Sequence, residues 1–239
     1  MKEFPDYLPF NPYKLKKADL QMFLTGRCRH RHTYLSHPNC FVTEYLLENK
    51  KFTRGFLDIE ASSLVADFGI ILSYVIKVEG KKKYYSSTIT KSDLENGNLD
   101  KGIVTQLVKD LQNFDEVITY YGTQFDLKFI RSRYLYWAKR DKKFAKKVKF
   151  PWYGYIKHKD VYYMAKNRLR LHRTRLDDVT RFLNIKGKTH IEPEYWIKAL
   201  TGNKKSLSYI LDHNKKDVDI LEKVYKDLEP YVRKTNRSI

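Results

Sequence analysis

Cysteine is scarce in this chain, and long apolar runs are absent. Two cysteines in 239 residues are too few for a disulfide framework. No stretch approaches the roughly 18 uninterrupted apolar residues that a membrane-spanning helix needs. The opening segment MKEFPDYLPFNPYKLKK has charges and prolines where a secretory signal has an apolar run. We therefore expect a soluble, cytoplasmic protein that makes no use of a membrane.

Acidic residues are also few relative to basic ones. Lys and Arg number 47 against 28 Asp and Glu, which gives a formal net charge of +19. An excess of this size in a globular protein is typical of a polyanion partner, above all nucleic acid, although a lysine-rich solvated surface is an alternative. Disorder is excluded, because 42% of the residues are hydrophobic and 19 Tyr and 13 Phe are available for a core.

The composition divides the chain near residue 50. Residues 1–50 hold both cysteines, three of the seven histidines and four of the seven prolines. We expect them to form a small irregular N-terminal segment, followed by one larger domain over residues 51–239.

Hydrophobic periodicity in the larger segment changes from strands to alternating strands and helices. We expect an exposed connection at 139–149 in the Lys-rich stretch KRDKKFAKKVK, and a hairpin turn at 80–83. The pattern predicts an α/β fold with a mixed sheet flanked by helices. Strands are expected at 51–60, 67–78, 83–90, 117–121 and 157–162, and helices at 103–114, 125–140, 176–183, 192–200 and 207–228.

Two carboxylates stand two residues apart in the first of these strands. Asp58 and Glu60 should point to the same face, since side chains alternate along a strand. Two adjacent like charges on a buried strand are unfavourable unless a cation neutralises them, and Mg²⁺ prefers carboxylate ligands. The alternative is a strand end with solvated acids.

Two further positions add acidic groups. Asp126 opens a helix directly after a strand, where open α/β sheets place ligands, although an acid also favours a helix N-terminus without any ligand. His213 and Asp217 are four residues apart and share one face of the last helix. An ordinary surface His–Asp pair would have the same spacing.

Taken in order, these motifs resemble the DEDD (DnaQ-like) exonuclease superfamily, which has a ribonuclease-H-like fold. The resemblance covers residues 52–232 and is with the branch related to family B polymerase exonuclease domains and to bacterial and phage ribonuclease-H-like exonucleases. LDIEASSL, YYGTQFD and HNKKDVDILEKVYKDLEPY resemble the first, second and third exonuclease motifs, and HKDVYYMAKNRLRLHRTRLDDVTRFLNI resembles the strand and helix between the last two. Two positions depart from the pattern, because Tyr121 stands where the second motif usually has Asn, and His213 where the third has Tyr.

The resemblance implies a metal-dependent 3′–5′ exonuclease that releases 5′-mononucleotides from single-stranded DNA or RNA. Asp58, Glu60 and Asp217 would hold one Mg²⁺ or Mn²⁺ ion, and Asp58 with Asp126 a second. His213 would orient or deprotonate the attacking water, since imidazole titrates near neutral pH. A polymerase or another replication protein is a candidate partner. A structure-specific endonuclease and an inactive nucleic-acid-binding module remain alternatives.

The segment CRHRHTYLSHPNC gathers both cysteines with three histidines. Cys28, His30, His37 and Cys40 could form a four-ligand zinc site, with His32 as a competitor for the place of His30. A phosphate contact made by the basic Arg/His-rich loop, with Arg27, Arg29 and Arg31, is an alternative, and so is chance.

Aromatic and basic residues alternate in KKVKFPWYGYIKHKDVYY, residues 146–163. Single strands are commonly bound by base stacking within a basic groove. The candidate stacking platforms are Phe150, Trp152, Tyr153 and Tyr155. An apolar cover over the core would explain the same pattern.

Overall fold

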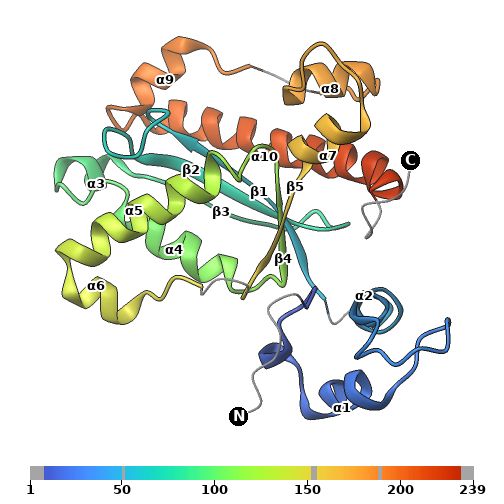
Figure 1. Cartoon of the computed structure of the whole chain (residues 1–239). Helices are drawn as coiled ribbons and strands as arrows, with labels where there is room; N and C mark the ends of the chain where they lie inside the picture. Colours follow the sequence, from blue (N-terminus) through green and yellow to red (C-terminus); the bar gives the residue numbers. More distant parts are fainter. Residues whose placement is uncertain (1–7, 50–51, 152–154, 188–189, 233–239) are drawn as a thin grey trace.

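A five-stranded mixed sheet forms the centre of the molecule (Figure 1). The computed structural model describes residues 8–49, 52–151, 155–187 and 190–232. The strand order is β3-β2-β1-β4-β5, with β1, β2 and β3 antiparallel and β1, β4 and β5 parallel. This confirms the expected α/β fold with a mixed sheet. The strands are β1 (Arg54–Ala61), β2 (Ile71–Val78), β3 (Tyr84–Thr88), β4 (Glu116–Thr119) and β5 (Lys157–Asp160).

All five strands are found, but their ends differ from the expected ranges by up to four residues, most of all at the second strand. The second strand begins at Ile71 rather than at residue 67, because residues 62–69 turn at the sheet edge before pairing resumes. The strand expected at 157–162 ends at Asp160, whose side chain caps the helix that follows. The hairpin turn at 80–83 is present, and Gly80 has a φ of +66° that favours glycine.

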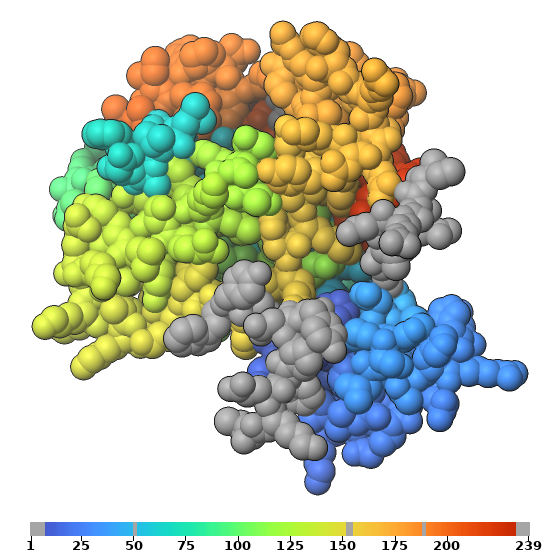
Figure 2. Space-filling view, viewed as in Figure 1, coloured from blue at the N-terminus to red at the C-terminus, as the bar shows by residue number. Residues whose placement is uncertain are grey.

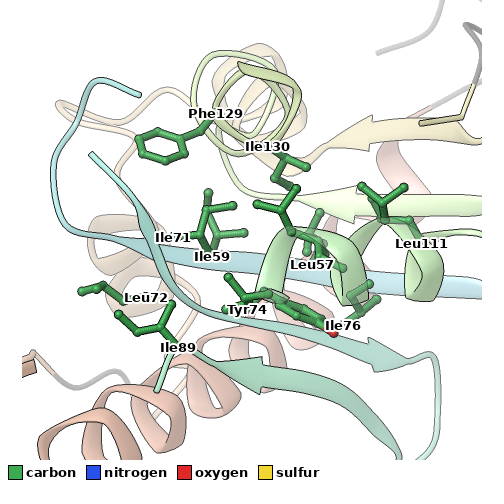
Figure 3. Packing of buried hydrophobic residues seen from close by; sticks show 14 of the residues in the cluster. Leu57, Ile59, Ile71, Leu72, Tyr74, Ile76, Ile89, Leu111, Phe129 and Ile130 are labelled. Carbon is green, nitrogen blue, oxygen red and sulfur yellow. The ribbon is translucent and has the colours of Figure 1, made fainter. Parts of the chain in front are cut away.

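Helices α4 (Lys101–Leu111) and α5 (Asp126–Arg140) cover one face of the sheet (Figure 3). Their buried side chains, including Leu111, Phe129 and Ile130, pack against Leu57 and Ile59 of β1. The odd-numbered residues of β1 therefore face this core.

The opposite face is covered chiefly by the long C-terminal helix α10 (Lys204–Leu228). Val218, Leu221 and Tyr225 of α10 share a core with Phe56 of β1 and Ile118 of β4. The even-numbered side of β1 thus faces α10. The other helices of the larger domain are α3 (Lys91–Glu95), α6 (Lys142–Lys147), α7 (Val161–Arg168), α8 (Leu176–Phe182), α9 (Pro193–Ala199) and the 3₁₀ turn η3 (Glu229–Tyr231).

The Lys-rich stretch expected to be an exposed connection is partly helical. Helix α6 is capped by Asp141, which accepts hydrogen bonds from the backbone of Lys143 (2.8 Å) and Phe144 (3.0 Å). Phe144 and Val148 are buried in the main core. Hydrophobic periodicity did not predict this helix, because only Phe144 and Val148 pack against the core and most of the other residues are lysines.

The N-terminal residues form a small helical unit with its own core (Figures 1 and 2). Three aromatic rings, Phe10, Phe23 and Phe41, meet at centroid distances of 5.0–5.2 Å. The elements of this N-terminal unit are η1 (Pro12–Lys14), α1 (Lys17–Thr25), α2 (Pro38–Cys40) and the π-helical turn η2 (Phe41–Leu46).

The N-terminal unit contacts the larger domain at the amino ends of the parallel strands. Lys14 Nζ donates to the carbonyl of Phe114 (2.8 Å), two residues before β4. Asn11 Nδ2 donates to the carbonyl of Tyr155 (3.3 Å), two residues before β5. Nothing among the helices of the described residues has both the length and the apolar character needed to cross a bilayer.

Candidate active site

The carboxylates of β1 lie on the side of the sheet that α10 covers. Leu57 and Ile59 point into the core beneath α4 and α5, so Asp58 and Glu60 point the other way. Both are partly buried, and both lie in the second half of β1, toward its carboxyl end. The strand period therefore brings the two acids to the same face, as expected.

Helix α10 presents His213 and Asp217 to the same place. His213 Nε2 lies 3.5 Å from Asp217 Oδ2 and 4.0 Å from Glu60 Oε1, and both α10 residues are buried. One ligand atom from each of Glu60, His213 and Asp217 lies within 4.8 Å of the others. We call these three residues the Glu–His–Asp cluster. Asp219 points elsewhere, since Lys77 and Tyr84 both bond its carboxylate.

Asp126 approaches the main chain of β1 from the start of α5. The N–H of Ile59, between Asp58 and Glu60, donates to Asp126 Oδ1 at 3.1 Å. The pairing of β1 with β4 ends at Phe56, three residues before Ile59. The Asp126 side chain therefore accepts the Ile59 hydrogen bond where β4 no longer does. Burial raises the pKa of the Asp126 carboxyl to about 7, and the charge of Asp160 adds to the rise. Asp58 and Asp126 are outside the Glu–His–Asp cluster itself but border it along β1.

A second buried acid, Asp160, holds the turn that leads into α5. Its carboxylate accepts hydrogen bonds from the backbone N–H groups of Tyr121 (2.8 Å) and Thr123 (2.9 Å). It also caps α7 by accepting from Tyr162 N (3.1 Å). Asp160 therefore both caps α7 and positions the Tyr121–Thr123 turn, and the second role is visible only in the tertiary structure.

Tyr121 has a backbone conformation that is unusual for a tyrosine. Its φ is +66°, in the left-handed region that asparagine enters more readily than other non-glycine residues. This gives a physical reason for the asparagine usual at this position of the second motif. The Tyr121 ring packs edge-on against Tyr162 at a centroid distance of 4.8 Å.

Tyrosines gather where β4 and β5 end. Tyr121 follows β4, and Tyr162 and Tyr163 open α7 directly after β5. The ring centroids of Tyr162 and Tyr163 are 5.1 Å apart, and Lys166 Nζ lies 5.8 Å from the centroid of the Tyr162 ring. We call these three rings the tyrosine cluster. In the sequence, the tyrosine pairs at 120–121 and 162–163, each at the end of an expected strand, indicate this cluster.

Two of the four aromatic residues expected to stack on bases, Phe150 and Tyr155, are described by the structure. Phe150 packs against the main core, 5.2 Å from the Tyr134 ring. Tyr155 lies before β5, and Lys14 Nζ of the N-terminal unit lies 4.7 Å from the centroid of its ring. The structure therefore does not bring Phe150 or Tyr155 to the carboxylates. Trp152 and Tyr153 are outside the described residues.

The loop between β1 and β2 exposes apolar side chains close in sequence to Glu60. Leu64 and Phe68 are 85% and 86% exposed. Arg133 of α5 donates to the carbonyl of Ala66 at 3.1 Å and anchors the loop to α5. The loop is therefore anchored, although its apolar tips face solvent.

The comparisons with known proteins agree with this architecture. A family model described as the RNase_H superfamily matches residues 55–229. The chain belongs to the RNase_H superfamily. The matched region begins one residue after the start of β1 and ends just after α10, so it holds all five residues of the candidate site and leaves out the N-terminal unit.

Among solved structures, one similar chain is the family B DNA polymerase of the hyperthermophilic archaeon Pyrobaculum calidifontis. The TM-score is 0.55 at 14% identity, over 75% of this chain and 25% of the polymerase chain. This chain thus corresponds to about a quarter of that polymerase, and the likeness concerns the fold. No curated protein matches the sequence.

The residues of this RNase_H superfamily site fit a divalent cation. Glu60 and Asp217 supply the carboxylate oxygens that hard divalent cations prefer, and His213 adds one imidazole nitrogen. Burial raises the pKa of the Asp126 carboxyl because it disfavours the charged form, which a cation would stabilise. Superfamily membership supports nuclease-type activity with divalent metals.

Proposed function

We propose that this protein is a 3′–5′ exonuclease that hydrolyses phosphodiester bonds at single-stranded ends of DNA or RNA. The observation that carries the proposal is the convergence of Glu60, His213 and Asp217 beside Asp58 and Asp126. These residues come from three elements far apart in sequence, at the positions expected from the three exonuclease motifs. Likeness to a family B polymerase supports the same branch of the fold.

The carboxylates divide into two groups on this proposal. Asp58, Glu60 and Asp217 would hold one divalent ion, and Asp58 with Asp126 the other. When bound, such ions lower the pKa of a water ligand and stabilise the charge on the leaving 3′ oxygen. The hydrogen bond from the Ile59 N–H holds one oxygen of Asp126 against the main chain of β1.

His213 is placed to orient the attacking water or take its proton. Its Nε2 lies among the carboxylate oxygens of Glu60 and Asp217, which would stabilise the imidazolium that proton transfer creates. The same atom is close enough to serve as a metal ligand. A variant at His213 can separate these roles, as argued in the Discussion.

The substrate strand would reach the site over the carboxyl ends of β4 and β5. The tyrosine cluster lies there, and each exposed ring face can stack on a base. The net charge of +19 supports binding to the phosphate backbone. We therefore propose that the tyrosine cluster, rather than the stretch around Phe150 and Tyr155, stacks on the bases of the substrate.

The activity test is a time course on 5′-labelled and 3′-labelled single strands, of DNA and of RNA, with Mg²⁺, Mn²⁺ or EDTA. The 5′-labelled strand should give a ladder that shortens from the 3′ end, and EDTA should abolish it. The 3′-labelled strand should release labelled mononucleotide at once. A circular single strand should remain intact.

Other outcomes would replace the proposal. Cleavage of the circular strand would show an endonuclease on the same fold. Binding without cleavage under all metal conditions would show an inactive nucleic-acid-binding module.

A matched pair of α10 variants tests the site itself. Asp217→Asn removes a carboxylate of the Glu–His–Asp cluster, whereas Asp212→Asn removes an exposed one on the same helix, whose partner is Lys215 at 3.5 Å. We expect Asp217→Asn to lose cleavage while Asp212→Asn keeps it. Equal activities would remove Asp217 from the catalytic machinery.

A further inference from the structure

The N-terminal unit contains a second group of metal-ligating side chains that the nuclease proposal does not use. One ligand atom from each of Cys28, His30, His37 and Cys40 lies within 4.8 Å of the others. His30 Nδ1 is 3.7 Å from Cys28 Sγ and 3.5 Å from Cys40 Sγ. Zinc bond lengths of about 2.3 Å to sulfur and 2.0–2.1 Å to nitrogen give a sulfur–nitrogen edge of about 3.6 Å in a regular tetrahedron.

We propose that Cys28, His30, His37 and Cys40 bind one structural Zn²⁺ ion. The two sulfur–nitrogen distances match the tetrahedral value, and two thiolates with two imidazoles are a donor set typical of closed structural zinc sites. Soft sulfur ligands also distinguish this site from the carboxylate site, which suits Mg²⁺ or Mn²⁺.

The backbone on the Cys28 side is shaped for this geometry. Cys28 N donates to the carbonyl of His32 (2.9 Å), and Arg31 N donates to the carbonyl of Cys28 (2.8 Å). Arg31 has a φ of +66°, which closes a tight turn, and Arg27 pairs with Thr33 across it. This short hairpin places Cys28 and His30 on the same side.

The other half of the site lies at the start of a helix. His37 is the N-cap of α2, and Cys40 lies one turn later, with its N–H bonded to the His37 carbonyl at 2.9 Å. The hairpin that holds Cys28 and the helix start at His37, nine residues after Cys28, thus face each other. The ion would join two segments of a unit whose core is small, and metal binding contributes to folding in such units.

The two histidines of the hairpin, His30 and His32, have different surroundings. His30 has its Nδ1 against both sulfurs, whereas His32 belongs to no metal-ligating group among the described residues. The His32 ring instead packs at a tilt against the His37 ring, with a centroid distance of 4.0 Å. His32 is therefore a matched control for His30 in the same loop.

The location indicates a structural ion rather than a catalytic one. The N-terminal unit contacts the amino ends of β4 and β5 through Lys14 and Asn11, whereas the nuclease carboxylates lie toward the carboxyl ends of the parallel strands. The zinc proposal stands independently of nuclease activity, so the two can fail separately.

Metal analysis of the full chain, purified without chelators, tests the proposal. We expect about one zinc per chain in the wild type and in His32→Ala, and a large loss in His30→Ala and in Cys40→Ser. Asp217→Asn should keep its zinc, because it changes only the carboxylate site. Absence of zinc from the wild type, or equal zinc in His30→Ala and His32→Ala, would overturn the proposal.

A second measurement avoids variants that fail to fold. A mercurial thiol reagent added to wild-type protein should release one zinc, detected by a coloured chelator, as two thiols react. Replacement by Co²⁺ should give the intense visible bands of tetrahedral coordination and a sulfur-to-metal charge-transfer band. Thiol reaction without zinc release, or an intact mass lower by two hydrogens from a Cys28–Cys40 disulfide, would contradict the proposal.

Discussion

His213 occupies the position at which the third exonuclease motif of the resembling branch usually has tyrosine. It is buried, with Nε2 3.5 Å from Asp217 and 4.0 Å from Glu60. Two roles fit this position, a base for the attacking water and a metal ligand. The two roles predict different effects of removing the imidazole: loss of a base lowers the rate, whereas loss of a ligand also lowers metal affinity.

We predict that His213→Ala lowers kcat by about 10²–10⁴-fold, the usual contribution of a positioned base. Metal affinity and substrate KM should stay close to wild type, and His213→Tyr should recover part of the rate. Single-turnover kinetics and calorimetric Mn²⁺ titration measure these quantities. A large loss of Mn²⁺ affinity in His213→Ala would assign His213 as a ligand, and an unchanged rate would leave it with neither role.

Tyr121 shows strain at the turn that precedes Asp126. A non-glycine residue in the left-handed region costs about 1–2 kcal/mol, and asparagine tolerates the conformation better. We predict that Tyr121→Asn is more stable than Tyr121→Ala by about 1 kcal/mol in urea unfolding. Both variants lose the ring contact with Tyr162, so the difference isolates the backbone. An alanine variant as stable as the asparagine variant would contradict the prediction.

At the scale of elements, a buried ion pair joins α4, α5 and the loop before β2. Arg133 of α5 makes two bonds of 2.7 Å to Asp100, the residue before α4. Asp100 also accepts from Trp137 Nε1 (2.8 Å) and from Ile71 N (3.1 Å), where β2 begins. One carboxylate thus positions the start of a strand against two helices, and Arg133 extends the network to Ala66 in the loop.

We predict that Asp100→Asn lowers the free energy of unfolding by about 3–5 kcal/mol, because it leaves the Arg133 guanidinium buried without its counter-charge. The control is Lys91→Ala, which removes an exposed pair with Glu95 (3.3 Å) and should cost less than about 1 kcal/mol. Urea denaturation followed by tryptophan fluorescence measures both. Similar midpoints for the two variants would show that the buried pair contributes little.

At the scale of the whole molecule, the charge of +19 should govern substrate affinity. Asp58→Asn should bind nucleic acid without cleaving it, which allows equilibrium measurements. We predict a log–log slope of affinity against salt of about −0.7 per phosphate neutralised, or about −3 if roughly four phosphates are contacted. Fluorescence anisotropy with a labelled single strand measures this slope. A slope near zero would indicate that binding does not depend on the basic surface.

The sequence by itself determined the local geometry of the site. The two-residue period of a strand places Asp58 and Glu60 on one face, and the four-residue spacing on a helix does the same for His213 and Asp217. The sequence also grouped Cys28, His30, His37 and Cys40, whose candidate ligand atoms lie within 4.8 Å of one another. Each of these follows from the regular geometry of one short segment, which neighbouring residues largely determine.

Only the tertiary structure decided relations between segments. It selected His30 over His32 beside the two sulfurs, and it used Asp160 to hold the turn before α5. It also put Tyr155 near the amino ends of the parallel strands and the tyrosine cluster near the carboxyl ends. The physical reason is that these contacts join separate elements, which lie more than 30 residues apart for Asp160 and the turn and ten residues apart for His30 and Cys40. Hydrophobic periodicity reports only which side of its own element a residue faces.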